Sequence, residues 1–314
     1  MPDLLGTVSH FSPVRVKAEA MLSRRALLQA LRPDSLLWRR AMMMGVTRGP
    51  EAWVRYSPPM FGLAFAVALR EKREIIRANL RRVCGPRSAV EELRDVAAVF
   101  SNYASCLTEA LLLGSDRGYE LRSRSRGVER YHACAAEGRG VIIATAHTGG
   151  WEVAGPVLSG VHQGEVVVVM QRERDERARA IQDQARGRAG VKVVHIGESA
   201  FDALTLLASL RKQAVVAMQI DRVPPAMRSR TAQFFGEPWQ VPEGPLTLAA
   251  VSGAPILPVF SRRIAFMEYE AMVAPAIRLP RRPSPAELDG AAQQLMRAME
   301  DFVRAYPTQW FHFV

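Results

Sequence analysis

The stretch Val141-Ile-Ile-Ala-Thr-Ala-His147-Thr-Gly-Gly-Trp-Glu152 decides the fold and directs attention to the chemistry. Its first six residues are apolar or small enough for a buried strand, and His147 follows where that strand ends. Two glycines then allow a turn with close backbone approach, and a helix begins near Trp151. A buried strand followed by a short loop and a helix predicts one unit of a parallel α/β sheet.

The rest of residues 127–314 repeats this alternation of strands and helices. Apolar strands are expected at residues 141–146, 165–170, 191–195, 214–219 and 255–260, with helices at 151–158, 174–188, 199–211 and 244–252. A further strand at about 263–273 and a helix from 284 to about 305 complete the pattern. Because strands buried on both faces are typical of parallel sheets, the predicted fold class is α/β, with a mainly parallel central sheet flanked by helices.

Residues 1–126 are predicted to form a helical N-terminal region. Apolar residues recur at helical spacing from Val90 to Leu111, and Ser88 followed by Glu91 forms a plausible capping box. Before this helix, an apolar run at 60–69 leads into a basic segment at 70–82. That order is typical of an interfacial membrane anchor, and equally of a core helix with a solvated basic end.

The net charge of +11 is concentrated in this helical region. Residues 1–126 hold 21 basic and 12 acidic residues, net +9, whereas residues 127–314 hold 21 and 19. An anionic membrane, an acidic partner protein and a nucleic acid are the partner classes that such a charge fits. We exclude nucleic acid, because no nucleic-acid-binding motif accompanies the charge and the basic segment is interleaved with aliphatic rather than stacking aromatic residues.

Several other classes of protein and site are not expected. The longest nearly unbroken apolar run is about half of what a bilayer requires, so no transmembrane helix is predicted. The N-terminus lacks the layout of a signal peptide. Three cysteines without a Cys-x-x-Cys pair predict neither a disulfide framework nor a zinc site. The phosphate-loop, dinucleotide, nucleophile-elbow and H-E-x-x-H motifs are missing, and we predict no metal and no cofactor.

His147 and Glu152 form the first candidate catalytic pair. On a straight helix, side chains five positions apart point about 140° apart, so the two can meet only if His147 stays on the loop. A histidine oriented by a carboxylate can take a proton from a hydroxyl group as a general base. No serine or cysteine nucleophile in an activating context accompanies the pair, which favours direct attack by a substrate hydroxyl. The alternative is a structural histidine that caps a helix.

The string from His147 to Glu152 resembles the H-x-x-x-x-[DE] motif of the glycerolipid and lysophospholipid acyltransferase superfamily. Its Gly-x-Trp-Glu form is similar to the bacterial lipid A biosynthesis acyltransferases and to the phosphatidylinositol mannoside acyltransferases. Further matches follow in the family's order: Arg172, Asp221-Arg222, Phe234-Phe235-Gly236, Pro242-Glu-Gly-Pro245, the run from Leu248 to Pro258, Arg263, and Tyr306-Pro-Thr-Gln-Trp310.

The resemblance implies an O-acyltransferase that moves a fatty acyl chain from acyl carrier protein or acyl-CoA to a hydroxyl of a membrane glycolipid or lysolipid. His147 would be the general base for direct attack on the thioester, and Glu152 would orient it. Arg172 and Asp221 would complete the polar catalytic site, through an ion pair with Glu152 or through contacts to the acceptor.

Four residues are the candidates for substrate binding: Gly149, Gly150, Trp151 and Arg222. The two glycines would supply backbone donors near the thioester oxygen. The enzyme is expected at the cytoplasmic face of the inner membrane as a peripheral protein, with residues 1–126 facing anionic lipids or the carrier protein and residues 127–314 forming the acyltransferase domain. The alternative is a catalytically inactive, peripheral membrane-binding protein of the same fold. Neither reading predicts the oligomeric state.

Overall fold

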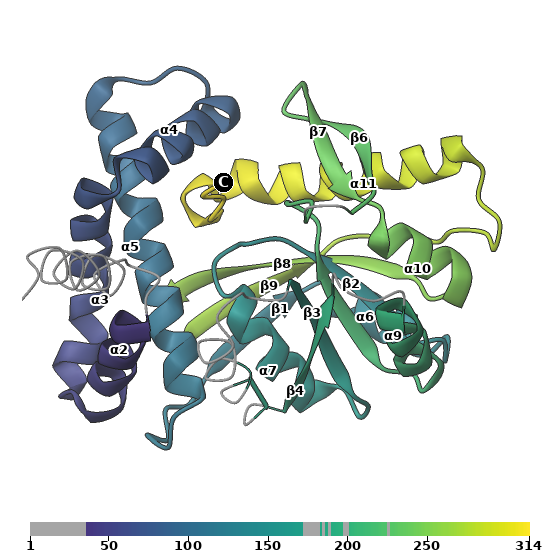
Figure 1. Ribbon diagram of the computed structural model, residues 1–314, viewed down its shortest axis with the longest axis horizontal. Helices are drawn as coiled ribbons and strands as arrows, with labels where there is room; N and C mark the ends of the chain where they lie inside the picture. The colour runs from purple at the N-terminus through teal and green to yellow at the C-terminus, as the bar shows by residue number, and fades with distance from the viewer. Residues whose placement is uncertain (1–35, 172–182, 184–185, 188–189, 197–200, 225–226) are drawn as a thin grey trace, which may run out of the picture. The chain divides into compact units, whose positions relative to one another are not determined.

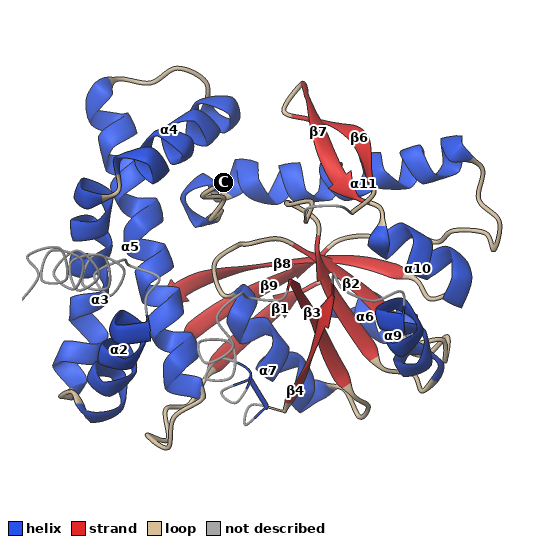
Figure 2. Cartoon of the chain, viewed as in Figure 1, coloured by secondary structure: helices blue, strands red, loops and turns tan. Residues whose placement is uncertain are grey.

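The computed structural model describes residues 36–171, 183, 186–187, 190–196, 201–224 and 227–314. Its main feature is a seven-stranded sheet in the order β1-β9-β8-β2-β5-β3-β4, drawn in Figures 1 and 2. The strands are β1 (Arg122–Arg126), β2 (Val141–Thr145), β3 (Val166–Gln171), β4 (Val191–Ile196), β5 (Val215–Gln219), β8 (Ile256–Ala265) and β9 (Glu268–Val273). Five neighbouring strands, β8, β2, β5, β3 and β4, are parallel, and β9 pairs antiparallel with β8. The predicted α/β fold class is confirmed.

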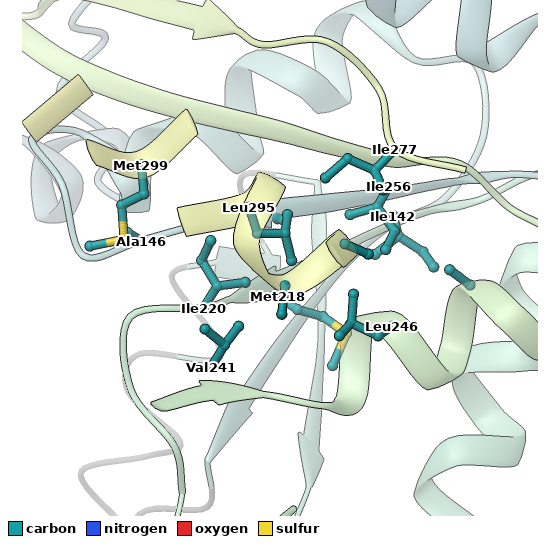
Figure 3. Close-up of a cluster of buried hydrophobic side chains, with 14 of the residues drawn as sticks. Ile142, Ala146, Met218, Ile220, Val241, Leu246, Ile256, Ile277, Leu295 and Met299 are labelled. Atoms are coloured by element: carbon teal, nitrogen blue, oxygen red, sulfur yellow. The ribbon is translucent and has the colours of Figure 1, made fainter. Parts of the chain in front are cut away.

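Helices cover both faces of the sheet, as Figure 1 shows for α11 and α7. The helices α9 (Phe201–Arg211), α10 (Gly244–Ser252) and α11 (Pro285–Ala305) pack on one face, and α6 (Val128–Ala135) and α7 (Trp151–Val161) on the other. Along β2, Ile142 belongs to the first cluster and Ile143 to the second. Figure 3 shows the first cluster, to which Ile142 of β2, Leu246 of α10 and Leu295 of α11 belong. Burial on both faces is why this strand reads as an unbroken apolar run.

A two-stranded hairpin of β6 (Ser229–Phe234) and β7 (Glu237–Pro242) was not predicted. Its turn residues, Phe235 and Gly236, have φ values of 51° and 77°. Such turns usually contain Asn-Gly or Asp-Gly, and a phenylalanine seldom adopts a positive φ, so the local sequence carries little hairpin signal. Contacts with α11 hold the turn, because the Phe235 amide donates to Glu300 and Arg304 lies over the Phe235 ring.

The N-terminal region contains α2 (Leu36–Arg48), α3 (Glu51–Ala68), α4 (Arg70–Cys84) and α5 (Ala89–Leu113). The predicted capping box of Ser88 and Glu91 begins α5. Within the part of the chain that the structure describes, α5 is the one helix long and apolar enough to cross a membrane. Core helices of soluble proteins meet the same criterion, and α5 packs on α3 so closely that a Cβ at Gly62 would lie 2.5 Å from the carbonyl oxygen of Phe100.

Two features differ from the simple division at residue 126. The segment Arg122–Arg126, which we had included in the helical region, forms the exposed edge strand β1, where Arg124 and Arg126 pair with Glu268 and Glu270 of β9. In addition, α5 is bonded to the sheet through the buried carboxylate of Glu109. That carboxylate accepts hydrogen bonds from the Arg263 side chain, the Tyr269 hydroxyl and the Met267 amide. Burial raises the pKa of Glu109.

Several arginines of the basic helix α4 form hydrogen bonds and ion pairs with other parts of the chain. Arg73 donates to the carbonyl oxygens of Ala66 and Val67 and so completes the end of α3. Arg77 and Arg81 both pair with Glu92 of α5. Arg82 pairs with Glu237 and lies 5.2 Å from the ring centre of Trp239, both in the β6–β7 hairpin. These four side chains therefore have partners within the chain and are not free basic groups.

Candidate active site

His147 and Asp221 meet at the carboxyl edge of the sheet. His147 follows β2 and Asp221 follows β5, and these strands are parallel neighbours with Thr145 opposite Gln219. The His147 Nδ1 lies 2.9 Å from Asp221 Oδ1, and the His147 amide donates to Asp221 Oδ2 at 3.2 Å. The Asp221 side chain is fully buried, whereas the His147 side chain is 17% exposed. We call this pair the His147–Asp221 dyad.

The surroundings of the dyad favour an ionised Asp221. Burial by itself disfavours the carboxylate, but the charge and hydrogen bond of His147, with a smaller contribution from Arg222, outweigh it and hold the pKa of Asp221 well below its usual range. Burial lowers the pKa of His312 to about 4, so this neighbour is uncharged at neutral pH. An ionised Asp221 accepts the proton of His147 Nδ1, which leaves Nε2 as the basic nitrogen. No residue within the described ranges hydrogen-bonds to Nε2.

Glu152, which we expected to orient His147, has no hydrogen bond to that histidine among the described residues. Its carboxylate instead forms a bidentate ion pair with Arg186. Glu152 Oε2 lies 3.1 Å from Arg186 Nε, and Glu152 Oε1 lies 2.8 Å from Arg186 Nη2. The reason is positional: Glu152 lies in the first turn of α7, while Asp221 comes to the histidine from the adjacent strand. Asp221, expected only as a further polar residue, is the carboxylate that contacts His147.

The Glu152–Arg186 pair is one link of a longer chain of polar contacts. Arg186 Nη1 lies 3.6 Å from Asp183 Oδ1, and Asp183 Oδ2 lies 2.7 Å from His195 Nε2 at the end of β4. Arg186 and Asp183 belong to the connection between β3 and β4. Glu152 therefore fastens that connection to α7, beside the dyad.

The two glycines face the interior of the protein, contrary to the expected role as backbone donors. The Gly149 amide donates to the Gln309 carbonyl oxygen at 2.8 Å, and a Cβ at Gly149 would lie 2.0 Å from Gln309 Oε1. A Cβ at Gly150 would lie 2.3 Å from the Tyr269 ring, and the Gly150 amide interacts with the buried thiol of Cys106. The chain needs glycine here because its own side chains pack against the loop.

The remaining predicted residues lie as follows. The Trp151 ring meets the His147 ring edge to face, with centres 5.4 Å apart. The half-buried Arg222 donates from Nη2 to the Phe311 carbonyl oxygen at 2.8 Å, and burial lowers its pKa. Arg172 lies outside the described residues. The expected helix at 174–188 is also largely outside them.

A short segment, residues 309–312, forms the other wall of the site and was not predicted. We call it the C-terminal segment. Gln309 accepts from and donates to the backbone of Arg263 through its side-chain amide, at 2.8 Å in both cases. The backbone of Trp310 forms an isolated antiparallel β-bridge with Thr148, and its indole N–H donates to Asp221 Oδ2 at 3.3 Å. The Phe311 amide donates to the His147 carbonyl oxygen at 2.6 Å. The family motif Tyr306-Pro-Thr-Gln-Trp310 marked this part of the chain, but it did not indicate which residues the segment contacts.

The chemistry open to this site is proton transfer at Nε2 of His147. Among the described residues, no group of three or more His, Cys, Asp and Glu side chains is arranged to hold a metal ion. Cys106 is buried and has a pKa raised by burial to about 12, so it remains a thiol at neutral pH. A histidine supported by a buried carboxylate can activate a hydroxyl group that reaches the exposed edge of its ring.

Comparisons with known proteins relate the chain to lipid acyltransferases. The sequence profile of the bacterial lipid A biosynthesis acyltransferases matches residues 35–314. The phosphatidylinositol mannoside acyltransferase of Mycobacterium tuberculosis (strain ATCC 25618 / H37Rv) is 27% identical over 249 residues, 76% of this chain and 74% of that protein. The protein of the same name from Mycolicibacterium smegmatis is 28% identical over 192 residues, 59% of this chain and 62% of that protein.

Proposed function

Because the chain belongs to the bacterial lipid A biosynthesis acyltransferase family, we propose that it transfers a fatty acyl group from a thioester donor to a hydroxyl of a membrane glycolipid or lysolipid. The family and the mycobacterial relatives make it a lipid acyltransferase. The donor in the proposal is acyl carrier protein or acyl-CoA. The observation that carries the proposed mechanism is the hydrogen bond between His147 Nδ1 and the buried carboxylate of Asp221.

In the proposed reaction, Nε2 of His147 takes the proton from the acceptor hydroxyl as its oxygen attacks the thioester carbonyl carbon. The negative charge of Asp221 stabilises the imidazolium that forms. The tetrahedral intermediate then breaks its carbon–sulfur bond, and the thiolate takes the proton back from Nε2. The products are an ester and a free thiol, so atoms and charge balance, and no residue of the chain is acylated.

For the acceptor we propose a sugar hydroxyl of a glycolipid ahead of a lysolipid. The names of the family and of its mycobacterial relatives both refer to glycolipids, lipid A and phosphatidylinositol mannoside. In cells that lack the gene, we expect one membrane glycolipid to accumulate with one fatty acyl chain fewer. Mass spectrometry of total lipids measures this directly, and the missing mass gives the chain length.

The control for that measurement is complementation. The wild-type gene should restore the lost acyl chain, whereas the gene encoding His147→Ala should not. If the lipids lack no acyl chain while the purified protein binds vesicles without transferring acyl groups, the protein is the inactive membrane-binding alternative.

We further propose that α3 holds the protein at the membrane surface from the cytoplasmic side. One face of α3 is buried among neighbouring helices, but the other exposes a stripe of large apolar side chains: Trp53, Tyr56, Met60, Phe61, Leu63 and Val67. Met60 and Val67 are 70% and 77% exposed. Aromatic and aliphatic side chains on one helix face are suited to the boundary between lipid headgroups and acyl chains. The apolar stripe supports a membrane contact better than the arginines of α4 that are paired inside the protein.

Replacing Leu63 with glutamate should weaken binding to vesicles that contain anionic lipids. Burying a leucine side chain is worth about 1.5–3 kcal/mol, so we expect the affinity to fall about tenfold or more. Sedimentation with vesicles measures it. Leu204→Glu on α9 is the matched control, because Leu204 is 56% exposed and Leu63 is 47% exposed. Equal binding by both variants would contradict the role of α3.

A further inference from the structure

The carboxylate of Asp221 is held at both of its oxygens. Oδ1 contacts His147 Nδ1, while Oδ2 accepts from the His147 amide at 3.2 Å and from the Trp310 indole N–H at 3.3 Å. A carboxylate with a single partner can rotate about its Cβ–Cγ bond, and donors to Oδ2 prevent that rotation. Trp310 is thus the one side chain among the described residues that donates to Oδ2.

We propose that Trp310 is a positioning residue for acyl transfer, whose indole N–H holds Asp221 in the orientation that presents Oδ1 to His147. This inference rests on the proposed role of the His147–Asp221 dyad. Trp310 need not touch either substrate. It acts on His147 through Asp221.

Trp310 is well placed for this role because it is itself immobilised. The side chain is 3% exposed, and its ring meets the rings of Phe234, Trp239 and His312 with centres 5.4, 5.9 and 5.2 Å apart. An indole packed on several sides holds its N–H in a fixed direction. A donor on a flexible surface chain would lose more conformational entropy to make the same bond.

The same C-terminal segment also fixes the loop that carries His147. The carbonyl oxygen of Gln309 accepts from the Gly149 amide, and the Phe311 amide donates to the His147 carbonyl oxygen. One rigid segment therefore holds both partners of the dyad, the histidine through its backbone and the aspartate through its side chain. Because the distance between Nδ1 and Oδ1 depends on both, the segment sets the geometry of the dyad.

Removing the indole N–H has a chemical consequence besides loss of orientation. Oδ2 would keep more of its negative charge, and the carboxylate would hold the shared proton and the imidazolium more strongly. The other charged or titratable groups facing the dyad are Arg222 after β5 and His312 of the C-terminal segment, with Tyr103 of α5 beside Arg222. The substitution leaves these groups in place, so a change in pH dependence would report on the lost N–H.

The test replaces Trp310 with phenylalanine, which keeps a buried ring and removes the donor. We expect kcat to fall about 10- to 100-fold, as for the loss of a hydrogen bond to a charged group, with KM unchanged. The acidic limb of the kcat profile should move to higher pH. The matched control is Trp239→Phe, which also replaces an indole of the same aromatic group with a phenyl ring but removes no hydrogen bond to Asp221. Its loss of kcat should be much smaller than that of Trp310→Phe, and the acidic limb of its pH profile should stay in place.

A measurement without turnover separates this inference from the proposed function. In proton NMR, the Nδ1–H between His147 and Asp221 should give a downfield signal that is absent in His147→Ala. That signal should shift in Trp310→Phe and stay in place in Trp239→Phe. Identical signals and identical kcat in the two tryptophan variants would overturn the inference. A wild-type protein with the signal but without acyl transfer would instead count against the proposed function alone.

Discussion

His147→Ala is expected to lower the rate of acyl transfer by about 10²–10⁴-fold, the range that a well-placed general base contributes. The variant loses the only nitrogen that we assign to the proton of the acceptor hydroxyl. Its effect should fall on kcat, because the donor and acceptor sites remain. Single-turnover assays with purified protein, an acyl thioester and the lipid acceptor measure the loss.

His162→Ala is the control for this variant. His162 is a partly exposed histidine at the end of α7, where it contacts the Tyr131 hydroxyl at 2.8 Å and the Gln213 carbonyl oxygen at 3.1 Å. The His162→Ala variant should have a lower free energy of unfolding and the same rate of acyl transfer as the wild type. Circular dichroism should show that both variants are folded. Full activity in a folded His147→Ala protein would contradict the mechanism.

Asp221→Asn is expected to lower kcat by about 10²–10⁴-fold, although the new side chain has almost the same shape. The two donors at Oδ2, the His147 amide and the Trp310 indole, would fix the carbonyl oxygen of the asparagine on their side. Its NH₂ group would then face His147 Nδ1 and require that nitrogen to accept. The proton would move to Nε2, which could no longer act as a base.

Glu152→Gln is the matched carboxylate-to-amide change on the other side of the site. It weakens the pair with Arg186 and loosens the connection between β3 and β4, but it leaves the His147–Asp221 dyad intact. We expect a smaller loss of kcat than in Asp221→Asn and no shift of the acidic limb of the pH profile. The reverse ranking of the two variants would show that Glu152, and not Asp221, supports the histidine.

The sequence predicted those parts of the fold that depend on local patterns. The central strands were predicted because burial on both faces produces a continuous apolar run. The start of α11 at Ser284 was predicted because a capping box is a pattern of four consecutive residues. The partner of His147 was not predicted, because it depends on β2 and β5 being neighbours, and strand order is decided by packing between distant segments. The chain therefore contained two carboxylates that could support the histidine. The spacing favoured Glu152, whereas the structure brings Asp221 into contact with it.

Other features were missed because their determinants lie far away in the chain. The positive φ of Phe235 is supported by Glu300 and Arg304 of α11, which no turn pattern contains. The C-terminal segment was recognisable as a motif, but its contacts with Gly149 and Asp221 follow only from the completed fold. The sequence motifs named residues that the structure places around His147, such as Trp151, Asp221 and Trp310, and the structure assigned their contacts.

Because the C-terminal segment forms one wall of the site, the site can be completed only late in the synthesis of the chain. The Asn79 side chain bonds to the His312 carbonyl oxygen across 233 positions, and contacts of such range form only after most of the chain has left the ribosome. The sheet that carries His147 and Asp221 can assemble earlier. We therefore expect a nascent chain that has not yet reached Gln309 to lack the backbone bonds at His147 and Gly149 and the indole donor to Asp221.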